Sequence, residues 1–163
     1  MEQSKRVYKV LKELNVPYKV HRHPAVYTSA EAEKYVDASM EGSRCKNLFL
    51  RNQKGNKHFL VIIDHSKMVN LKELARNLEE KKISFASENR LDKYLGLRPG
   101  SVTPFGLIND KNREVIVVVD EELKNEEKIN FHPNINTETL TVLFKDFERF
   151  LEWSGNTKLY LKI

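Results

Sequence analysis

Lys46 stands near the start of the apolar stretch "CKNLFLRN", where its residue type and position could do chemistry. An ammonium group held at the rim of a sheet can offer positive charge to an acyl or phosphate oxygen. Most lysines are solvated surface residues, so a strand-end lysine without a role is the alternative interpretation. Whether Lys46 is a functional residue therefore depends on the residues around it.

A second candidate is the segment "LRPGSVTPFGLIND", residues 97–110, which holds two prolines and two glycines. Gly100 and Gly106 allow positive φ or a close backbone approach, whereas the prolines fix φ and remove hydrogen-bond donors. Ser101 and Thr103 add hydroxyl groups. We expect a rigid turn that leads into a strand, and this turn either cradles a ligand or only shapes the start of the strand.

A third candidate is His132 in "NFHPNINTETL", a loop in which a polar ring could bind a ligand or have no role. His21 and His23 alternate on a predicted strand, but this spacing is not specific for a metal. The chain contains no GxSxG, Walker or GxGxxG motif, so we predict neither a metal nor a cofactor. Cys45 beside Lys46 suits packing better than nucleophilic catalysis.

Composition restricts the class of protein. With 163 residues, 40% hydrophobic and 31% charged, the chain is expected to fold as one domain, residues 1–163. No stretch has the pattern of a signal peptide or is apolar enough to span a membrane, which predicts a cytoplasmic protein. A single cysteine excludes an internal disulfide. The net charge of +5 permits binding to a polyanion such as RNA without requiring it.

The positions of these candidates depend on helices and strands that the sequence pattern predicts. Expected helices span residues 3–15, 70–82, 87–96 and 145–155, with another starting at Thr28, where Glu31 completes a capping-box spacing. Expected strands span residues 17–23, 45–52, 57–64, 83–86, 103–110, 114–123 and 137–144. Residues 45–64 should form a hairpin, and the apolar run 115–119 a central strand. The order favours a mixed α/β, α+β-like domain with a mostly antiparallel central sheet surrounded by helices.

Three motifs together give the sequence a resemblance to a known family. "CKNLFLR", "LGLRPGSVTPFGLIND" and "FHPNINTETL" occur in the order and at the spacing of the free-standing, YbaK-type aminoacyl-tRNA deacylases, which are related to the editing insertion of bacterial prolyl-tRNA synthetase. The long middle motif is the most specific, and the resemblance extends over nearly the whole chain. It implies the fold of that editing domain.

The resemblance also implies an activity: hydrolysis of the ester between an amino acid and the terminal adenosine of tRNA. Asn47, directly after the lysine, is similar to the branch that removes alanine from proline tRNA, because the cysteinyl-tRNA branch typically has threonine there. Cys45 departs from the threonine that the family often places before the lysine. A cysteinyl-tRNA or other deacylase of the family, and a noncatalytic sensor of aminoacyl-tRNA or amino acid, remain the alternatives.

The resemblance assigns roles to residues of this chain. Lys46, Gly100 and Ser101 are the expected catalytic residues, with backbone N–H groups of the 100–104 loop facing the ester carbonyl. The expected substrate-binding residues are Val26, Tyr27, Thr28, Asn47, Leu48, Thr103, Pro104, Phe105 and His132. Proline tRNA carrying alanine is the expected partner, and prolyl-tRNA synthetase or an elongation factor is left open as another. The group that activates water is not assigned.

Overall fold

The structure is a computed structural model, which describes residues 2–25 and 40–163. Its helices are α1 (Glu2–Glu13), α3 (Leu71–Asn77), α4 (Glu88–Leu95) and α5 (Phe144–Ser154), with 3₁₀ helices η1 (Pro104–Asn109) and η2 (Glu121–Asn125). Its strands are β1 (Lys19–Arg22), β2 (Ser43–Asn52), β3 (His58–Asp64), β4 (Ile83–Phe85), β5 (Val115–Asp120), β6 (Lys128–Phe131), β7 (Glu138–Leu143) and β8 (Lys158–Leu161). The helix predicted from Thr28 lies outside the described residues.

The described strands form one mixed sheet in the order β1-β7-β6-β2-β3-β5-β8, with β4 pairing separately with β2. Four of the seven pairings are antiparallel, including the predicted β2–β3 hairpin. The other three, β2–β6, β3–β5 and β5–β8, are parallel. This arrangement confirms the mixed α/β fold class.

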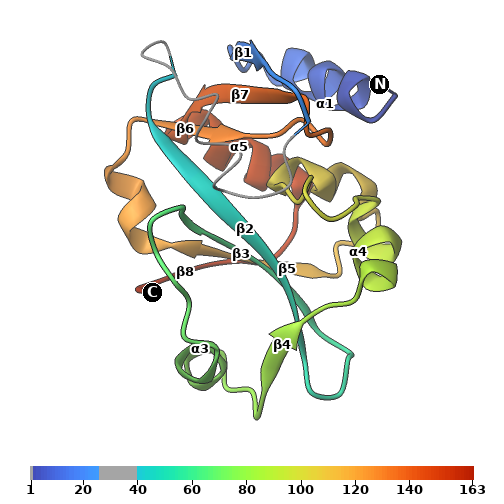
Figure 1. The fold of residues 1–163 in the computed structure, drawn as a ribbon, viewed down its shortest axis with the longest axis vertical. Coiled ribbons are helices and arrows are strands. Elements are labelled where there is room, and N and C mark those ends of the chain that lie inside the picture. Colours follow the sequence, from blue (N-terminus) through green and yellow to red (C-terminus); the bar gives the residue numbers. More distant parts are fainter. Residues whose placement is uncertain (1, 26–39) are drawn as a thin grey trace.

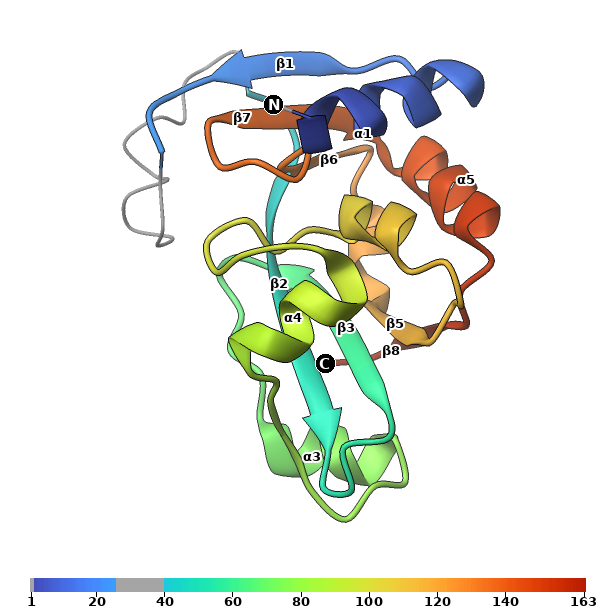
Figure 2. The ribbon, with the colours of Figure 1, turned by 90° about the vertical axis from the view of Figure 1, so that its right-hand side faces the viewer.

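Helices cover the two faces of the sheet unequally. On one face, α1, α4, η1 and α5 pack on the larger core, which includes Phe49, Ile62 and Phe131 from the strands. On the other face, α3 packs its Leu74 and Ala75 on a smaller cluster. Figures 1 and 2 show α1 beside β1 and β7 at one end of the molecule and α3 near the β2–β3 turn at the opposite end.

Local sequence signals explain most helix boundaries. Asn70 caps α3 by accepting hydrogen bonds from two backbone N–H groups, and Ser87 caps α4 in the same way with one. Gly96 and Gly155 end α4 and α5 in the left-handed conformation that glycine adopts without steric cost. None of the helices in the described ranges is long and apolar enough to cross a membrane.

The predicted strand over residues 103–110 is wrong, because this segment forms the 3₁₀ helix η1. Thr103 caps the helix through its side chain, and Pro104 occupies a first-turn position, where a missing N–H costs nothing. β5 consequently does not pair with this segment and lies in parallel between β3 and β8. The strands β6 and β8 were not expected, because four-residue strands give a weak pattern.

Candidate functional site

The side chains of β2 point alternately to the two faces of the sheet. Cys45 and Phe49 pack on the larger core, so Asn47 between them lies on the same face. Leu48 and Leu50 pack on the smaller cluster instead, so Lys46 belongs to the face that α3 covers in part. The two neighbouring candidate residues therefore flank β2 from opposite faces.

One edge of β2 is open beside these two residues. Along that edge β6 pairs with Ser43 and Arg44, and β4 pairs with residues 50–52. No strand within the described part of the chain pairs with residues 45–48 there. The Phe49 carbonyl accepts a hydrogen bond from the Ala86 N–H, which lies outside β3. Because backbone groups two residues apart on a strand point to the same edge, the N–H and carbonyl of Asn47 also point to the open edge. A ligand at this edge could reach side chains from both faces.

The loop before η1 lies against this part of β2. The Ser101 N–H donates to the Arg98 carbonyl at 3.0 Å, which closes a four-residue turn. Pro99 and Gly100 occupy its central positions, and Gly100 has a φ of 88°, as a type II turn requires. Because the Ser101 N–H is hydrogen-bonded within the turn, only the hydroxyl of Ser101 can donate to a ligand.

Backbone amides of the same loop are available for a ligand. Neither the Gly100 N–H nor the Val102 N–H has a hydrogen-bond partner among the residues that the structure describes. Pro104 has no N–H to offer. The Thr103 N–H likewise has no partner among the described residues. Because the Ser101 N–H is used in the turn, the backbone donors left in the 100–104 loop are the amides of Gly100, Val102 and Thr103.

Asn47 connects β2 to this loop. Its Nδ2 donates to the Val102 carbonyl at 3.2 Å, and this contact fixes the orientation of the amide. Its Oδ1 is buried and has no hydrogen-bond partner within residues 2–25 and 40–163. A buried carbonyl oxygen without a partner costs about 1–3 kcal/mol, so this acceptor is expected to meet a donor that arrives with a ligand.

The remaining predicted residues of the loop are buried. Thr103 is fully buried, and its Oγ1 accepts from the Phe105 N–H at 3.3 Å. Phe105 is 1% exposed and packs edge-to-face on Phe131 and Phe150. Pro104 is also buried. These three residues anchor the loop to the larger core, and any contact that they make with a ligand stays a prediction.

Lys46 has a backbone partner in this structure. Its Nζ donates to the Lys67 carbonyl at 2.9 Å, in the segment that follows β3. Lys67 itself bonds the buried carboxylate of Asp120 and that of Glu122, both at 2.7 Å. The segment that positions the Lys46 ammonium is therefore tied to the end of β5.

The face of the sheet that carries Lys46 is polar across β1, β7 and β6. His21 donates through Nε2 to the Thr141 hydroxyl at 3.0 Å, and that hydroxyl donates to Asn130 Oδ1. Asn130 Nδ2 in turn bonds the carbonyls of Glu41 and Ser43. Asn130 lies opposite Arg44 in the β2–β6 register, so Lys46, two residues further on, extends this row. The row ends at the open edge of β2.

His132 follows β6 on the same polar face. Its Nδ1 lies 2.8 Å from the Glu138 carbonyl, which can only accept, so Nδ1 carries the proton and Nε2 is an acceptor. Burial lowers the pKa of His132, and the nearby His23 adds to this effect. The ring is therefore neutral at pH 7. His23 contacts it edge-to-face at 5.9 Å and bonds Thr139 through Nε2.

Asn130, Thr139 and Thr141 were not singled out as site residues from the sequence. The available signal was the alternation of threonine with Leu140 and Val142 in "TETLTVLF", which indicates a strand with one polar face. That pattern alone does not show which other polar strands lie beside it. Only the register of β1, β7 and β6 shows which polar side chains lie beside Thr139 and Thr141.

Other reactive groups have ordinary surroundings. Burial raises the pKa of the Cys45 thiol, so the thiolate that a nucleophile needs is disfavoured. Within residues 2–25 and 40–163, no cluster of three or more His, Cys, Asp or Glu side chains is arranged to hold a metal ion. The predicted binding residues Val26, Tyr27 and Thr28 lie outside the described residues.

The structure thus assembles two groups of residues around one open edge. Asn47 and the loop from Gly100 to Thr103 lie on the face of the larger core, and they offer backbone N–H donors and a buried acceptor. Lys46 and His132 lie on the polar face. Leu48 shares the face of Lys46 but packs toward α3. Such a set can bind a carbonyl and an ammonium group while it holds a polar ligand across the edge of β2.

Comparisons with known proteins add independent information. The sequence matches the family described as the aminoacyl-tRNA editing domain over residues 23–150. The prolyl-tRNA editing protein ProX of Acetoanaerobium sticklandii is 41% identical over 157 residues, which cover 96% of this chain and 95% of that protein. The prolyl-tRNA synthetase associated domain-containing protein 1 of Danio rerio is 35% identical over 159 residues, which cover 96% of this chain and 85% of that protein.

Solved structures share the fold. A crystal structure described as a candidate trans-editing enzyme for prolyl tRNA synthetase superposes with a TM-score of 0.73 and 20% sequence identity. The match covers 100% of this chain and 98% of that one. The chain therefore has a fold that a solved structure shares.

Proposed function

The chain belongs to the aminoacyl-tRNA editing domain family, and from this premise we propose that it removes alanine from proline tRNA in trans. Editing of an aminoacyl-tRNA is hydrolysis of its ester, so the chain is an aminoacyl-tRNA deacylase. The similarity to a protein named for prolyl-tRNA editing supports proline tRNA as the substrate. Asn47 after Lys46 supports alanine over cysteine as the amino acid removed.

One observation carries the placement of the reaction. The buried Asn47 Oδ1, which has no partner among the described residues, lies next to a loop whose Gly100 and Val102 amides have none there either. An aminoacyl ester supplies the complementary groups, since its α-ammonium donates hydrogen bonds and its carbonyl oxygen accepts them. We therefore assign the α-ammonium to Asn47 and the ester carbonyl to the amides of Gly100 and Val102.

Hydrolysis at this position needs no covalent enzyme intermediate. Water adds to the ester carbonyl carbon, and the negative charge that develops on the carbonyl oxygen is stabilised by the two loop amides. The bond between that carbon and the ribose oxygen then breaks, and the ribose oxygen takes a proton. Lys46 holds the terminal nucleotide from the polar face, and the neighbouring ribose hydroxyl orients the water. The products are free alanine and uncharged tRNA.

Lys46 must exchange its partner to take this role. Its bond to the Lys67 carbonyl is one hydrogen bond at a partly exposed position, worth about 1.5–3 kcal/mol because the donor is charged. A phosphate or ribose oxygen of the substrate offers the same ammonium a comparable bond. The carbonyl thus keeps the side chain near the open edge until the substrate arrives.

Selectivity for alanine over proline must come from exclusion. Each extra methylene favours the larger ligand by about 1–3 kcal/mol in an apolar pocket, so attraction alone would select the prolyl ester. We propose that apolar walls, with Val26, Tyr27, Leu48 and Phe105 as candidates, admit a methyl group and clash with the proline ring. Phe105 is buried and packs against two aromatic rings, and such a side chain has little room to move away from a larger ligand.

The test is a side-by-side measurement of hydrolysis rates on proline tRNA carrying alanine, cysteine or proline. We expect the alanyl ester to be hydrolysed fastest and the prolyl ester to persist. A faster rate on the cysteinyl ester would assign the chain to a different specificity within the family. Binding of all three without hydrolysis would contradict the enzyme and favour a sensor of aminoacyl-tRNA.

A further inference from the structure

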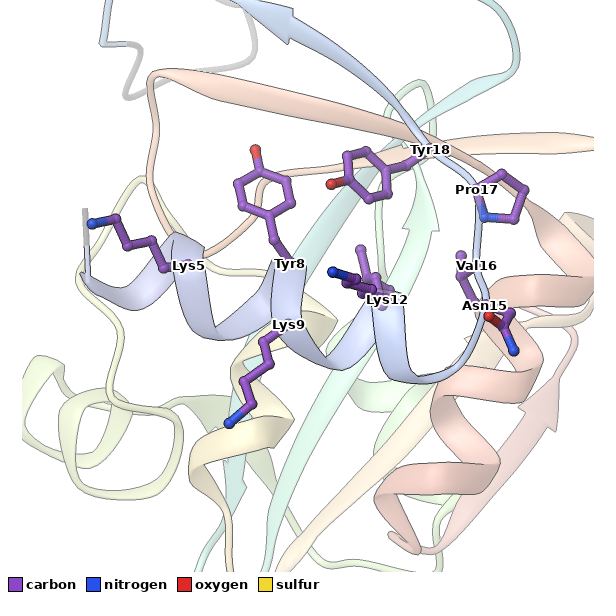
Figure 3. Close-up of a pocket in the computed structure, with 9 residues that line it drawn as sticks. Lys5, Tyr8, Lys9, Lys12, Asn15, Val16, Pro17 and Tyr18 are labelled. Carbon is purple, nitrogen blue, oxygen red and sulfur yellow. The ribbon is translucent and has the colours of Figure 1, made fainter.

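An open pocket of about 690 Å³ lies between α1 and β1, away from the β2 edge. Its polar lining comes mainly from one helix stripe, because Lys5, Tyr8, Lys9 and Lys12 are three or four residues apart. Tyr18, just before β1, closes the other side. Figure 3 shows both tyrosine rings standing between the helix and the strand. This lysine–tyrosine pocket has no part in the proposed hydrolysis.

The three lysines of the pocket carry charge that the fold does not neutralise. Lys5, Lys9 and Lys12 are exposed, and none forms an ion pair with a residue that the structure describes. They make a row about 10 Å long on the helix surface, at 1.5 Å of rise per residue. A row of unpaired ammonium groups attracts a polyanion whose charges repeat along one direction.

The two tyrosines give the same pocket an aromatic surface. Their ring centroids are 5.2 Å apart with an interplanar angle of 32°. The Tyr8 hydroxyl bonds Glu138, a carboxylate that also pairs with Arg22, so the ring of Tyr8 is fixed. Tyr18 is 40% exposed. An exposed ring beside a fixed one is a suitable surface on which an unpaired base can stack.

The burial of the apolar side chains that line the pocket argues against a membrane or a hydrophobic protein surface as its partner. Leu11 and Val16 are 1% and 5% exposed, because both belong to the larger core. What the pocket presents to solvent is therefore ammonium groups, the Asn15 amide, the Pro17 ring and tyrosine rings. This combination matches RNA, which presents phosphates and bases together.

Strand β1 connects the pocket to the polar face. It is an edge strand of the sheet, with Tyr18 before it and His21 and His23 on the face that also carries His132. Residues 18 and 23 are ~16 Å apart along an extended strand. An RNA end that passes over this edge can contact the lysine–tyrosine pocket and the polar face at the same time.

We propose that the lysine–tyrosine pocket is a tRNA docking site, in which Lys5, Lys9 and Lys12 contact backbone phosphates and Tyr18 stacks on an unpaired base. The inference rests on the proposed function for the identity of the RNA. It adds a second anchor to that function, so that the tRNA body is held on α1 while its terminal ester reaches β2.

The experiment measures binding of uncharged, fluorescently labelled tRNA by anisotropy over a range of salt concentrations. The variant replaces Lys5, Lys9 and Lys12 with glutamine, which keeps helix propensity and removes charge. Each phosphate contact contributes about 0.9 to the slope of log Kd against log salt, so the slope should fall by about 2 to 3. At about 0.1 M salt, Kd should increase at least tenfold.

A control variant replaces Lys54, Lys81 and Lys82, which are exposed near the β2–β3 turn and α3 at the opposite end of the molecule, with glutamine. It removes the same charge and should leave the slope nearly unchanged. An equal loss in both variants would overturn the proposal, because net charge alone would then explain the binding. Unchanged binding in the α1 variant would also overturn it and point to an acidic protein as the occupant.

Tyr18 tests the stacking contact separately. Tyr18→Ala should weaken tRNA binding by about 5- to 150-fold, whereas Tyr18→Phe should bind as the native protein does. Equal binding by all three proteins would refute the stacking role.

Uncharged tRNA carries no aminoacyl ester, so these outcomes do not depend on hydrolysis. Rates on an alanyl-adenosine ester provide the complementary readout, because that substrate lacks the tRNA body. The α1 variant should hydrolyse it at the native rate, and a reduced rate would contradict a docking role.

Discussion

Replacing Asn47 with leucine should separate stability from activity. Leucine has a similar size and removes both the Nδ2 bond to the Val102 carbonyl and the buried, unpartnered Oδ1. The lost hydrogen bond costs about 1 kcal/mol, whereas removal of a buried acceptor without a partner regains about 1–3 kcal/mol. The free energy of unfolding should therefore stay within about 1 kcal/mol of the native value or increase.

Activity should respond in the opposite direction. If Asn47 Oδ1 accepts from the α-ammonium of the ester, the variant loses a hydrogen bond to a charged group, worth about 1.5–3 kcal/mol. This energy corresponds to a decrease of about 10- to 150-fold in kcat/KM. Denaturant unfolding gives the stability, and hydrolysis of alanyl-tRNA under kcat/KM conditions gives the activity.

Asn52, on the same strand, is the matched control. Its Oδ1 accepts from the backbone N–H groups of Asn56 and Lys57 at 3.0 and 3.1 Å, so its side chain is fully used by the fold. Asn52→Leu should lower the free energy of unfolding by at least about 2 kcal/mol. If Asn47→Leu destabilises the protein equally and the folded variant keeps its activity, the role given to Asn47 is refuted.

Three further results are expected. Gly100→Ala forces a side chain onto a φ of 88°, which costs about 1–3 kcal/mol and shifts the loop amides, so a folded variant with at least tenfold slower hydrolysis is expected by circular dichroism and kinetics. Gly106→Ala places a Cβ 2.6 Å from Leu97 Cδ1, so the melting temperature should fall in a thermal scan, and an unchanged value would exclude that tight packing. Burial and the Arg90 charge lower the pKa of His58 to about 4, so the unfolded state binds a proton at a higher pH than the folded state does. The free energy of unfolding should therefore have its full value above pH 6.5 and decrease by up to about 3 kcal/mol toward pH 4. Denaturant titrations of His58→Gln should show a smaller decrease over the same pH range.

Much of the architecture could be predicted because it depends on local patterns. The β2–β3 hairpin follows from two apolar runs and a glycine-containing turn, and α3 and α4 follow from Asn70 and Ser87 as caps. The segment 103–110 could not be assigned in the same way, because its apolar residues suit a strand as well as a short helix. The packing of Phe105 and Leu107 into the larger core favours the short helix over a strand, and this packing is visible only in the structure.

The site could be predicted in parts but not as an arrangement. Lys46, Asn47 and Gly100 were selected from their types and from the family motifs, while the alternation that places Lys46 and Asn47 on opposite faces follows only once β2 is a regular strand. The open edge beside them depends on where β6 and β4 stop pairing. Such register information comes from contacts between residues far apart in the sequence, which a single sequence does not contain.

The most direct measurement compares hydrolysis of alanyl- and prolyl-tRNA for proline by the native protein and by Lys46→Ala. We expect the native protein to release alanine while the prolyl ester persists, and we expect this activity to be lost in the variant, whose fold should be intact because Lys46 is partly exposed. Release of alanine at the native rate by Lys46→Ala, or no release by either protein, would contradict a hydrolytic site at the edge of β2.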